Sequence, residues 1–410
     1  MNDLRNDADI IIKEAIQNVL PDSAVVRALQ EMDIKCPRIH VVAVGKAAWQ
    51  MAAAASKYLG SRICRGIVIT KYGHVKGDIP DMTCFEAGHP VPDANSFAAT
   101  GEVLRMVRPL GASDAVLFLL SGGGSALFEK PLIPADELEA ITHQLLASGA
   151  DIVEMNTIRK RLSGVKGGRF AMMCAPAPVY SIVLSDILGD PLDMIASGPA
   201  CPDSSTCEQA QAIVEKYGLR LSAQAWECLK KETPHRLEHV YTQITGSVRQ
   251  LCRAAADACR ALGYTPLLLT DHLDCEAREA GAFLAAIART HQEDAQRLAF
   301  IAGGETVVHV TGKGKGGRNQ ELTLSAARGI SGIKRAAIFS VGSDGTDGPT
   351  DAAGGYCDGE TEETLNALGI DIYETLQNND AYTALDMCGG LIRTGPTGTN
   401  VNDVAVVLLR

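Results

Sequence analysis

The sequence predicts an α/β protein with two domains, each built on a largely parallel or mixed sheet flanked by helices. Apolar runs of strand length alternate with helix-like segments along nearly all of the 410 residues, a pattern typical of helices covering a mostly parallel sheet. The length leaves room for two or three domains of ordinary size. A polar, helix-rich stretch at 204–236 interrupts the alternation. We therefore expect domains at 1–236 and 237–410.

The first domain is expected to open with a helix and to continue with four strands. Ile12, Ile16, Val19 and Leu20 fall at helical spacing after acidic residues, which is typical of an amphipathic helix and not of a signal peptide. The expected strands are 38–44, 65–71, 115–120 and 179–185.

The second domain is expected to open with a helix at 247–263 and to continue with five strands. Two of its runs, 298–304 and 305–312, follow each other directly and are expected to pair as a hairpin. The other expected strands are 265–270, 336–342 and 404–410.

Composition limits the partners. A net charge of −11 argues against nucleic acid or an anionic membrane, and no apolar run approaches the roughly 18 residues of a membrane span. The 12 cysteines are scattered, without the paired spacing of a zinc or redox site. They indicate free thiols in a reducing cytoplasm. The sequence leaves room for a homo-oligomer.

Ligands of open α/β sheets bind beyond the carboxyl ends of the strands, so the residues after each strand are the candidates for chemistry. Gly45 and Lys46 follow the first strand. A lysine in the first turn of a helix faces the positive end of the helix dipole, which is unfavourable unless an anion lies nearby. The alternative is a solvated lysine.

Ser121, Gly122, Gly123, Gly124 and Ser125 follow the strand at 115–120. Successive glycines let backbone N–H groups converge, and the hydroxyls add donors, so this segment predicts a cradle for phosphate or carboxylate. It is not a Walker A loop, because that motif occurs nowhere in the chain. A plain flexible turn is the alternative.

The segment 154–171 carries the densest positive charge in this acidic chain. Half of its cations are expected to form a solvated face, and at least one is expected to meet a ligand. Gly167 and Gly168 would permit close approach of the backbone. Its basic residues are Arg159, Lys160, Arg161, Lys166 and Arg169.

Carboxylates follow two further strands. Asp186 comes after 179–185 and is a candidate Mg²⁺ ligand or a general base for a hydroxyl group. Asp190 follows it closely, with turn formation as its alternative role. Asp344, Asp347 and Asp351 come after 336–342, with spacing unlike that of an EF-hand. They are candidate Mg²⁺ ligands or turn formers.

The segment 310–322, VTGKGKGGRNQEL, contains G-x-G-x-x-G. A dinucleotide site would need an acid about twenty residues later, yet 333–340 reads IKRAAIFS. The preceding run also reads as a hairpin arm and not as the first strand of a βαβ unit. The glycines and their basic neighbours therefore suit a polyphosphate or a carboxylate better.

Seven motifs in order give the chain a family resemblance. From about residue 10 to its end it resembles the class II glycerate kinases, ATP-dependent glycerate 2-kinases with a carboxy-terminal MOFRL domain. The motifs are VGKAA (44–48), GHPVPDANS (88–96), LLSGGGSALFEKP (119–131), NTIRKRLSGVKGGRFA (156–171), SDILGDPLDMIASGP (185–199), GGETVVHVTGKGKGGRNQEL (303–322) and GSDGTDGPTDAAGG (342–355).

The resemblance implies a Rossmann-like domain, a MOFRL-type α/β domain and an active site in the cleft between them. It implies phosphoryl transfer from ATP, with Mg²⁺, to the 2-hydroxyl of D-glycerate. It assigns catalysis to Lys46 and Arg318, acting on one pool of negative charge. Glu305 and Asn319, in the motif of Arg318, are expected to bind substrate or phosphate.

Two rival functions remain open at this point. Many members of the family carry the name hydroxypyruvate reductase, so an NAD(P)H-dependent reductase is the first rival. It would need a dinucleotide site, which the loop at 310–322 does not offer. The second rival is a sensor that binds sugar phosphates without turnover, but such a sensor has no need for the acids at strand ends.

Overall fold

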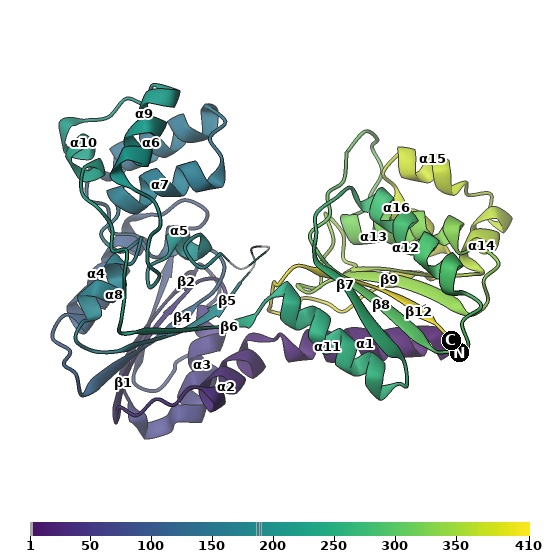
Figure 1. Ribbon diagram of the computed structural model, residues 1–410, viewed down its shortest axis with the longest axis horizontal. Helices are drawn as coiled ribbons and strands as arrows, with labels where there is room; N and C mark the ends of the chain where they lie inside the picture. Colours follow the sequence, from purple (N-terminus) through teal and green to yellow (C-terminus); the bar gives the residue numbers. More distant parts are fainter. Residues whose placement is uncertain (1–2, 186, 188, 190) are drawn as a thin grey trace. The chain divides into compact units, whose positions relative to one another are not determined.

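The computed structural model describes residues 3–185, 187, 189 and 191–410. The chain divides into two compact units, each with its own sheet and helices (Figure 1). The N-terminal unit comprises 24–185 and 190–245, and the C-terminal unit comprises 1–23, 186–189 and 246–410. Among the described residues, no helix has the length and apolar character needed to cross a membrane.

The N-terminal unit contains a six-stranded sheet in the order β3-β2-β1-β4-β5-β6. The pairs β1–β2, β1–β4, β2–β3 and β4–β5 are parallel. This strand order is that of a doubly wound dinucleotide-binding sheet, whose ligand crevice opens where the order reverses, between β1 and β4. The strands are β1 (Arg38–Val44), β2 (Ile63–Lys71), β3 (Met82–Ala87), β4 (Asp114–Leu120), β5 (Val179–Leu184) and β6 (Val240–Gly246).

Helices cover both faces of this sheet (Figure 1). Alternate residues of the strands, such as Leu117 and Leu119, pack under α2 (Pro21–Glu31) and α3 (Ala48–Leu59) in one apolar core. Phe118 points the other way and contacts the ring of Phe170. That face carries α4 (Ala94–Val107) and α8 (Arg169–Cys174).

Four helices form a separate cluster with its own apolar core (Figure 1). Two of them occupy the polar stretch that was expected to be helical, so that expectation is confirmed. The four are α6 (Ala135–Ala147), α7 (Ile152–Leu162), α9 (Cys207–Tyr217) and α10 (Ala223–Leu229).

The C-terminal unit has a mixed six-stranded sheet in the order β11-β10-β9-β12-β8-β7. Only the β7–β8 pair is parallel among the pairs in the described part of this sheet. The strands are β7 (Thr265–Leu273), β8 (Leu298–Gly304), β9 (Ala336–Gly342), β10 (Gly354–Asp358), β11 (Leu391–Ile392) and β12 (Asp403–Leu409).

One face of this sheet packs against α1 (Asp3–Asn18) and α11 (Val248–Ala261), and the other against a group of five helices (Figure 1). The predicted first helix therefore exists, but it belongs to the core of the C-terminal unit. The five helices are α12 (Ala277–His291), α13 (Arg318–Gly329), α14 (Thr361–Ala367), α15 (Ile372–Gln377) and α16 (Ala381–Met387).

Two details differ from the sequence-based expectations. Residues 305–312 form no strand beyond an isolated bridge between Glu276 and Val307, so the hairpin prediction was wrong. The neighbours of β8 are β12 and β7, which leave no edge for a hairpin arm. The units also divide at 23/24 and 245/246, and not by one cut at 236, because β6 completes the N-terminal sheet.

Candidate active site

In the N-terminal unit, the loops after β1 and β4 meet at the switch point of the sheet. Gly45 has φ of +124°, and a Cβ there would lie 2.2 Å from Oγ of Ser121, so the approach requires glycine. The N–H of Lys46 donates to the carbonyl of Gly122 at 2.9 Å, and the N–H of Ala47 donates to Oγ of Ser121 at 3.1 Å. The predicted loops thus form one bonded structure.

Lys46 lies in the turn just before α3, with Ala47 as the N-cap, and not in the first turn of the helix. Its side chain is exposed, and both its Cγ and the ring of His89 lie close to Gly123. A Cβ on Gly123 would be 3.3 Å from that Cγ and 3.0 Å from Cδ2 of His89. Lysine, histidine and the glycine loop therefore lie next to one another.

The glycine loop also offers backbone N–H donors next to Lys46. Among the contacts between described residues, the N–H groups of Gly122 and Gly123 donate to no protein acceptor. Gly123 adopts a left-handed conformation, with φ of +88°. Converging backbone N–H groups beside an ammonium group are suited to hold an anion.

His89 is a site residue that sequence reasoning did not assign. Burial, together with the charges of Lys46, Lys71 and His74, lowers its pKa. His74 contacts the carbonyl of Lys46 through Nδ1 at 3.0 Å. The available signal was the position of His89 just after β3, but β3 itself was not predicted.

The basic segment differs from its expected solvated face, because three of its cations are buried. Nζ of Lys160 contacts Asp203 at 3.1 Å and Asp193 at 3.2 Å. Nζ of Lys166 contacts Glu129 at 2.7 Å. The third is Arg161, which is bonded to Glu232, Ser205 and the carbonyl of Thr157.

These ion pairs fix the segment in place, because buried charges need partners. Lys160 is only 1% exposed, so its ammonium group supports the fold beside the site. Arg159 reaches the glycine loop: its Nη2 lies 3.5 Å from the carbonyl of Ser125.

A strained turn adjoins the glycine loop and was not singled out from the sequence. Ala196 and Ser197 have φ of 51° and 60°, a left-handed conformation that side chains rarely adopt. Oγ of Ser197 donates to Asn156 at 2.8 Å and lies 3.5 Å from Oγ of Ser125. Strain of this kind gathers at functional sites. The candidate acids Asp186 and Asp190 lie outside the described residues.

In the C-terminal unit, Arg318 begins α13 and lies between two carboxylates. Its Nε and Nη2 donate to the two oxygens of Asp403 at 2.5 and 3.1 Å. Its Nη1 donates to Glu305 at 2.9 Å. Asp403 was missed because it lies at the start of a strand and not after its end: β12 is antiparallel to β8 and β9, so its first residue lies beside their carboxyl-terminal residues.

Asp347 holds the start of the same helix. Its carboxylate accepts the backbone N–H groups of Asn319 and Gln320 at 3.2 and 2.9 Å. Burial raises the pKa of Asp347 to about 6, although these bonds act in the opposite direction. The side-chain oxygen of Asn319 accepts from Ser340 at 2.6 Å. The predicted metal ligand Asp347 therefore acts as a helix cap.

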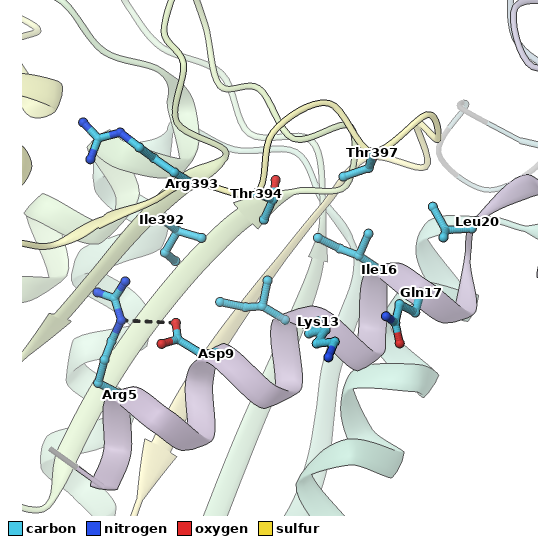
Figure 2. Close-up of a pocket in the computed structure, with 11 residues that line it drawn as sticks. Arg5, Asp9, Lys13, Ile16, Gln17, Leu20, Ile392, Arg393, Thr394 and Thr397 are labelled. Atoms are coloured by element: carbon cyan, nitrogen blue, oxygen red, sulfur yellow. Dashed lines mark hydrogen bonds and ion pairs between the residues drawn. The ribbon is translucent and has the colours of Figure 1, made fainter. Parts of the chain in front are cut away.

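The other two predicted metal ligands have separate surroundings. Asp344 is half-buried and accepts one backbone N–H, from Thr346, at 2.9 Å. Asp351 is exposed and bonded to Tyr382 and Arg393. Arg393 also lines a groove of about 530 Å³ along α1, whose lining residues are drawn in Figure 2. In the described ranges, no three acidic, histidine or cysteine side chains gather into a group able to hold a metal ion.

The first part of the loop before α13, residues 312–315, does not form a cradle of backbone donors. The N–H groups of Gly312, Lys313 and Lys315 donate to the side chains of Asn379, Asn378 and Asp380. The side chains of Lys313 and Lys315 remain exposed, with Lys315 over the ring of Tyr382. At residues 312–315 an anion would therefore meet lysine side chains, and not a nest.

Known proteins share this arrangement over the whole chain. Residues 7–230 match a domain of unknown function (DUF4147), and residues 298–403 match the MOFRL family. A D-glycerate 2-kinase of Thermotoga maritima is 52% identical over 97% of both chains. The chain belongs to the MOFRL-containing glycerate 2-kinase family. The resemblance expected from the motifs is confirmed.

Further members agree in sequence and in fold. A glycerate 2-kinase of Pyrococcus horikoshii is 38% identical over 99% of this chain and 98% of its own. The crystal structure of a glycerate kinase of Thermotoga maritima has a TM-score of 0.96 and 50% identity over the full length of both chains. Other relatives, in Agrobacterium vitis, carry a hydroxypyruvate reductase name.

Proposed function

We propose that this protein transfers a phosphoryl group from ATP to the 2-hydroxyl of D-glycerate, giving 2-phosphoglycerate and ADP. Its support is the full-length similarity to a relative named D-glycerate 2-kinase. The structural observation that carries it is the contact of Lys46 with the glycine loop at the switch point of a doubly wound sheet. That is where such sheets bind nucleotides and other anions.

In phosphoryl transfer, the protein mainly positions the reacting groups and stabilises their negative charge, and it contributes little covalent chemistry. Lys46 would offset negative charge on the transferring group, while N–H groups of Gly122 and Gly123 would hold its oxygens. Preorganised donors of this kind need no rearrangement as charge develops. Ser121 and Ser125 would add hydroxyl donors, and Arg159 would steady the loop through Ser125.

Arg318 would bind a second anionic group, either the glycerate carboxylate or a phosphoryl oxygen. Its side chain is 33% exposed, and its Nη1 donates to Glu305, whose side chain is 45% exposed. Asn319 would hold the first turn of α13 in place through its hydrogen bond with Ser340. These roles extend those that the family resemblance gives to the segment.

ATP-dependent transfer implies Mg²⁺, which prefers one or two carboxylates together with phosphate oxygens. Asp344 fits this requirement best, since it is half-buried with one backbone donor bonded to it. Asp347 fits less well because its oxygens already cap α13. When bound, Mg²⁺ would neutralise phosphate charge. Asp186 as proton acceptor and Asp190 as ligand stay predictions.

The substrates are then small molecules, and we place the reaction in a reducing cytoplasm, where free thiols such as Cys64 and Cys275 persist. The reductase alternative draws on the names of the Agrobacterium vitis relatives. Its dinucleotide fingerprint would have to be the loop at 312–317, where the N–H groups of residues 312–315 are already bonded to Asn378, Asn379 and Asp380.

The decisive assay uses the purified full chain with D-glycerate, ATP and Mg²⁺. Enolase added in excess consumes 2-phosphoglycerate directly, whereas 3-phosphoglycerate needs a mutase first. Phosphoenolpyruvate formed with enolase alone supports the proposed regiochemistry. A parallel reaction contains NADH and hydroxypyruvate without ATP. Turnover there, with no ADP formed in the first, would replace the kinase with the reductase.

A further inference from the structure

Asp403 is an unusual carboxylate for a strand residue. It opens β12, is 6% exposed, and gives both oxygens to the same side of the Arg318 guanidinium. The residue before it is also fixed: Asn402 has a left-handed φ of 65°, and its carbonyl accepts the N–H of Ser343 at 3.0 Å. The carboxylate therefore has little freedom to move.

This two-point contact decides how the guanidinium is oriented. A planar fork bonded through Nε and Nη2 cannot rotate without losing both bonds. The remaining nitrogen, Nη1, is then directed to Glu305, at the more exposed end of the cluster. A carboxylate or phosphate oxygen in the position of the Glu305 carboxylate would meet the same N–H.

Stability alone explains the cluster poorly. Burial raises the pKa of both Asp347 and Asp403, and the charge of Asp403 adds to the rise at Asp347, so ionising both carboxylates is unfavourable. Arg318 also stands at the positive end of the α13 dipole, where a cation is disfavoured. Buried ion pairs often contribute no net stability compared with apolar replacements. Such a cluster persists more readily where it serves a site.

We propose that Asp403 is a positioning residue, which holds the guanidinium of Arg318 so that its Nη1 edge receives an anionic group of the substrate. The proposal rests on the proposed kinase function. In its absence, Arg318 would keep its charge but sample several rotamers, and misplacement by about 1 Å can lower a rate on the order of 10²-fold.

The first test compares Asp403→Asn with Asp114→Asn. Asp114 is a matched control: it is 4% exposed, contacts Arg38 at 2.9 Å, and lies at the opposite end of its strand from the glycine loop. We expect D403N to lower kcat/KM for glycerate about 10- to 100-fold. We expect D114N to lower the melting temperature and leave kcat/KM close to that of the wild type.

The second test uses rescue, which a purely structural role would not produce. Removal of the side chain in Arg318→Ala leaves the Asp403 carboxylate facing an empty socket. Guanidinium ion at millimolar concentration is expected to restore part of the turnover of R318A, and none of that of the R318A/D403N double variant. Equal rescue of both variants, or D403N turnover within about twofold of wild type, would overturn the proposal.

The two hypotheses fail in different ways. If the wild-type chain forms no ADP with glycerate, the kinase function is wrong and the role of Asp403 in it falls too. If the wild type is active and D403N is equally active, only the positioning role is wrong. Circular dichroism of each variant shows whether a loss of activity is a loss of fold. Even if D403N proves unstable, R318A keeps the Asp403 carboxylate, and the absence of any rescue of R318A by guanidinium would also overturn the proposal.

Discussion

Gly123→Ala separates backbone strain from contact at the candidate site. Gly123 has φ of +88°, and the added methyl would lie 3.0 Å from Cδ2 of His89 and 3.3 Å from Cγ of Lys46. Both distances are shorter than ordinary van der Waals contact, so both side chains must move by a few tenths of an ångström. The left-handed conformation alone costs an alanine about 1–2 kcal/mol.

Gly149→Ala is the matched control. Gly149 has a similar φ of +76°, but a Cβ there would meet nothing within 4 Å. Both variants should therefore lose about 1–2 kcal/mol of unfolding free energy, a fall in melting temperature of about 2–4 °C per kcal/mol for units of this size. Only G123A should lose activity, with kcat/KM for ATP and glycerate lower by about 10- to 100-fold.

The assay is ADP release under saturating and limiting glycerate, with melting temperatures measured by calorimetry on the same preparations. Both variants place an alanine in a left-handed conformation, so the difference between their kcat/KM values reports only the displacement of Lys46 and His89. If G123A turns over as fast as G149A, the space beside Gly123 does not hold a reacting group. The glycine loop would then be a structural turn.

Lys46→Ala should lower kcat about 10²-fold or more, which is the scale of losing a preorganised charged donor. Its control is Lys57→Ala, which changes an exposed lysine of the neighbouring helix and should leave kcat unchanged. Unchanged turnover of K46A would remove Lys46 from the mechanism. Because burial raises the pKa of Asp347 to about 6, the folded chain binds this proton more tightly than the unfolded chain. Stability relative to Asp347→Asn should therefore fall by about 1–3 kcal/mol as the pH rises from about 4 to about 7; urea unfolding at both ends of the range measures it, and a constant difference would contradict the burial argument. Lys166→Met should destabilise the N-terminal unit by about 3–5 kcal/mol, because it leaves the buried Glu129 carboxylate unpaired, and Glu129→Gln in the same chain should recover part of that loss.

Most of the strands that the sequence predicts are buried on both faces. All seven residues of β4, β8, β9 and β12 are buried, and each was found as an apolar run. The edge strand β7 is mostly exposed but was still found, because it contains the apolar run TPLLLT. The edge strands β3 and β6 were not found, because they are mostly half-exposed and mix polar with apolar residues. Edge strands carry polar side chains that weaken the periodic signal.

The candidate site residues were likewise predicted only in part. Lys46 and the glycine loop follow parallel strands, so a search of strand ends finds them. Asp403 opens its strand, and it lies beside the carboxyl-terminal residues of β8 and β9 only because β12 is antiparallel to them. Strand direction depends on the whole sheet and has no local signature. The burial of Lys160 likewise depends on Asp203, which lies forty-three positions later.

The docking of α1 on the C-terminal unit makes that unit discontinuous along the chain. Its apolar core includes Ile11, Ile12 and Ala15 from the first helix together with Val404 and Val406 from the last strand. Along the chain, α1 precedes the N-terminal unit, whereas α11 and the last strand, which share its core, follow that unit. A fragment beginning at Gly246 would leave a hydrophobic stripe uncovered and should aggregate.

The ends of the described chain nevertheless lie side by side (Figure 1), where Asp3 and Arg410 form an ion pair. A short linker joining them, with new termini opened near Ser23, would place the α1 segment directly after β12. Such a circular permutant would let nearly the whole C-terminal unit be translated as one uninterrupted stretch.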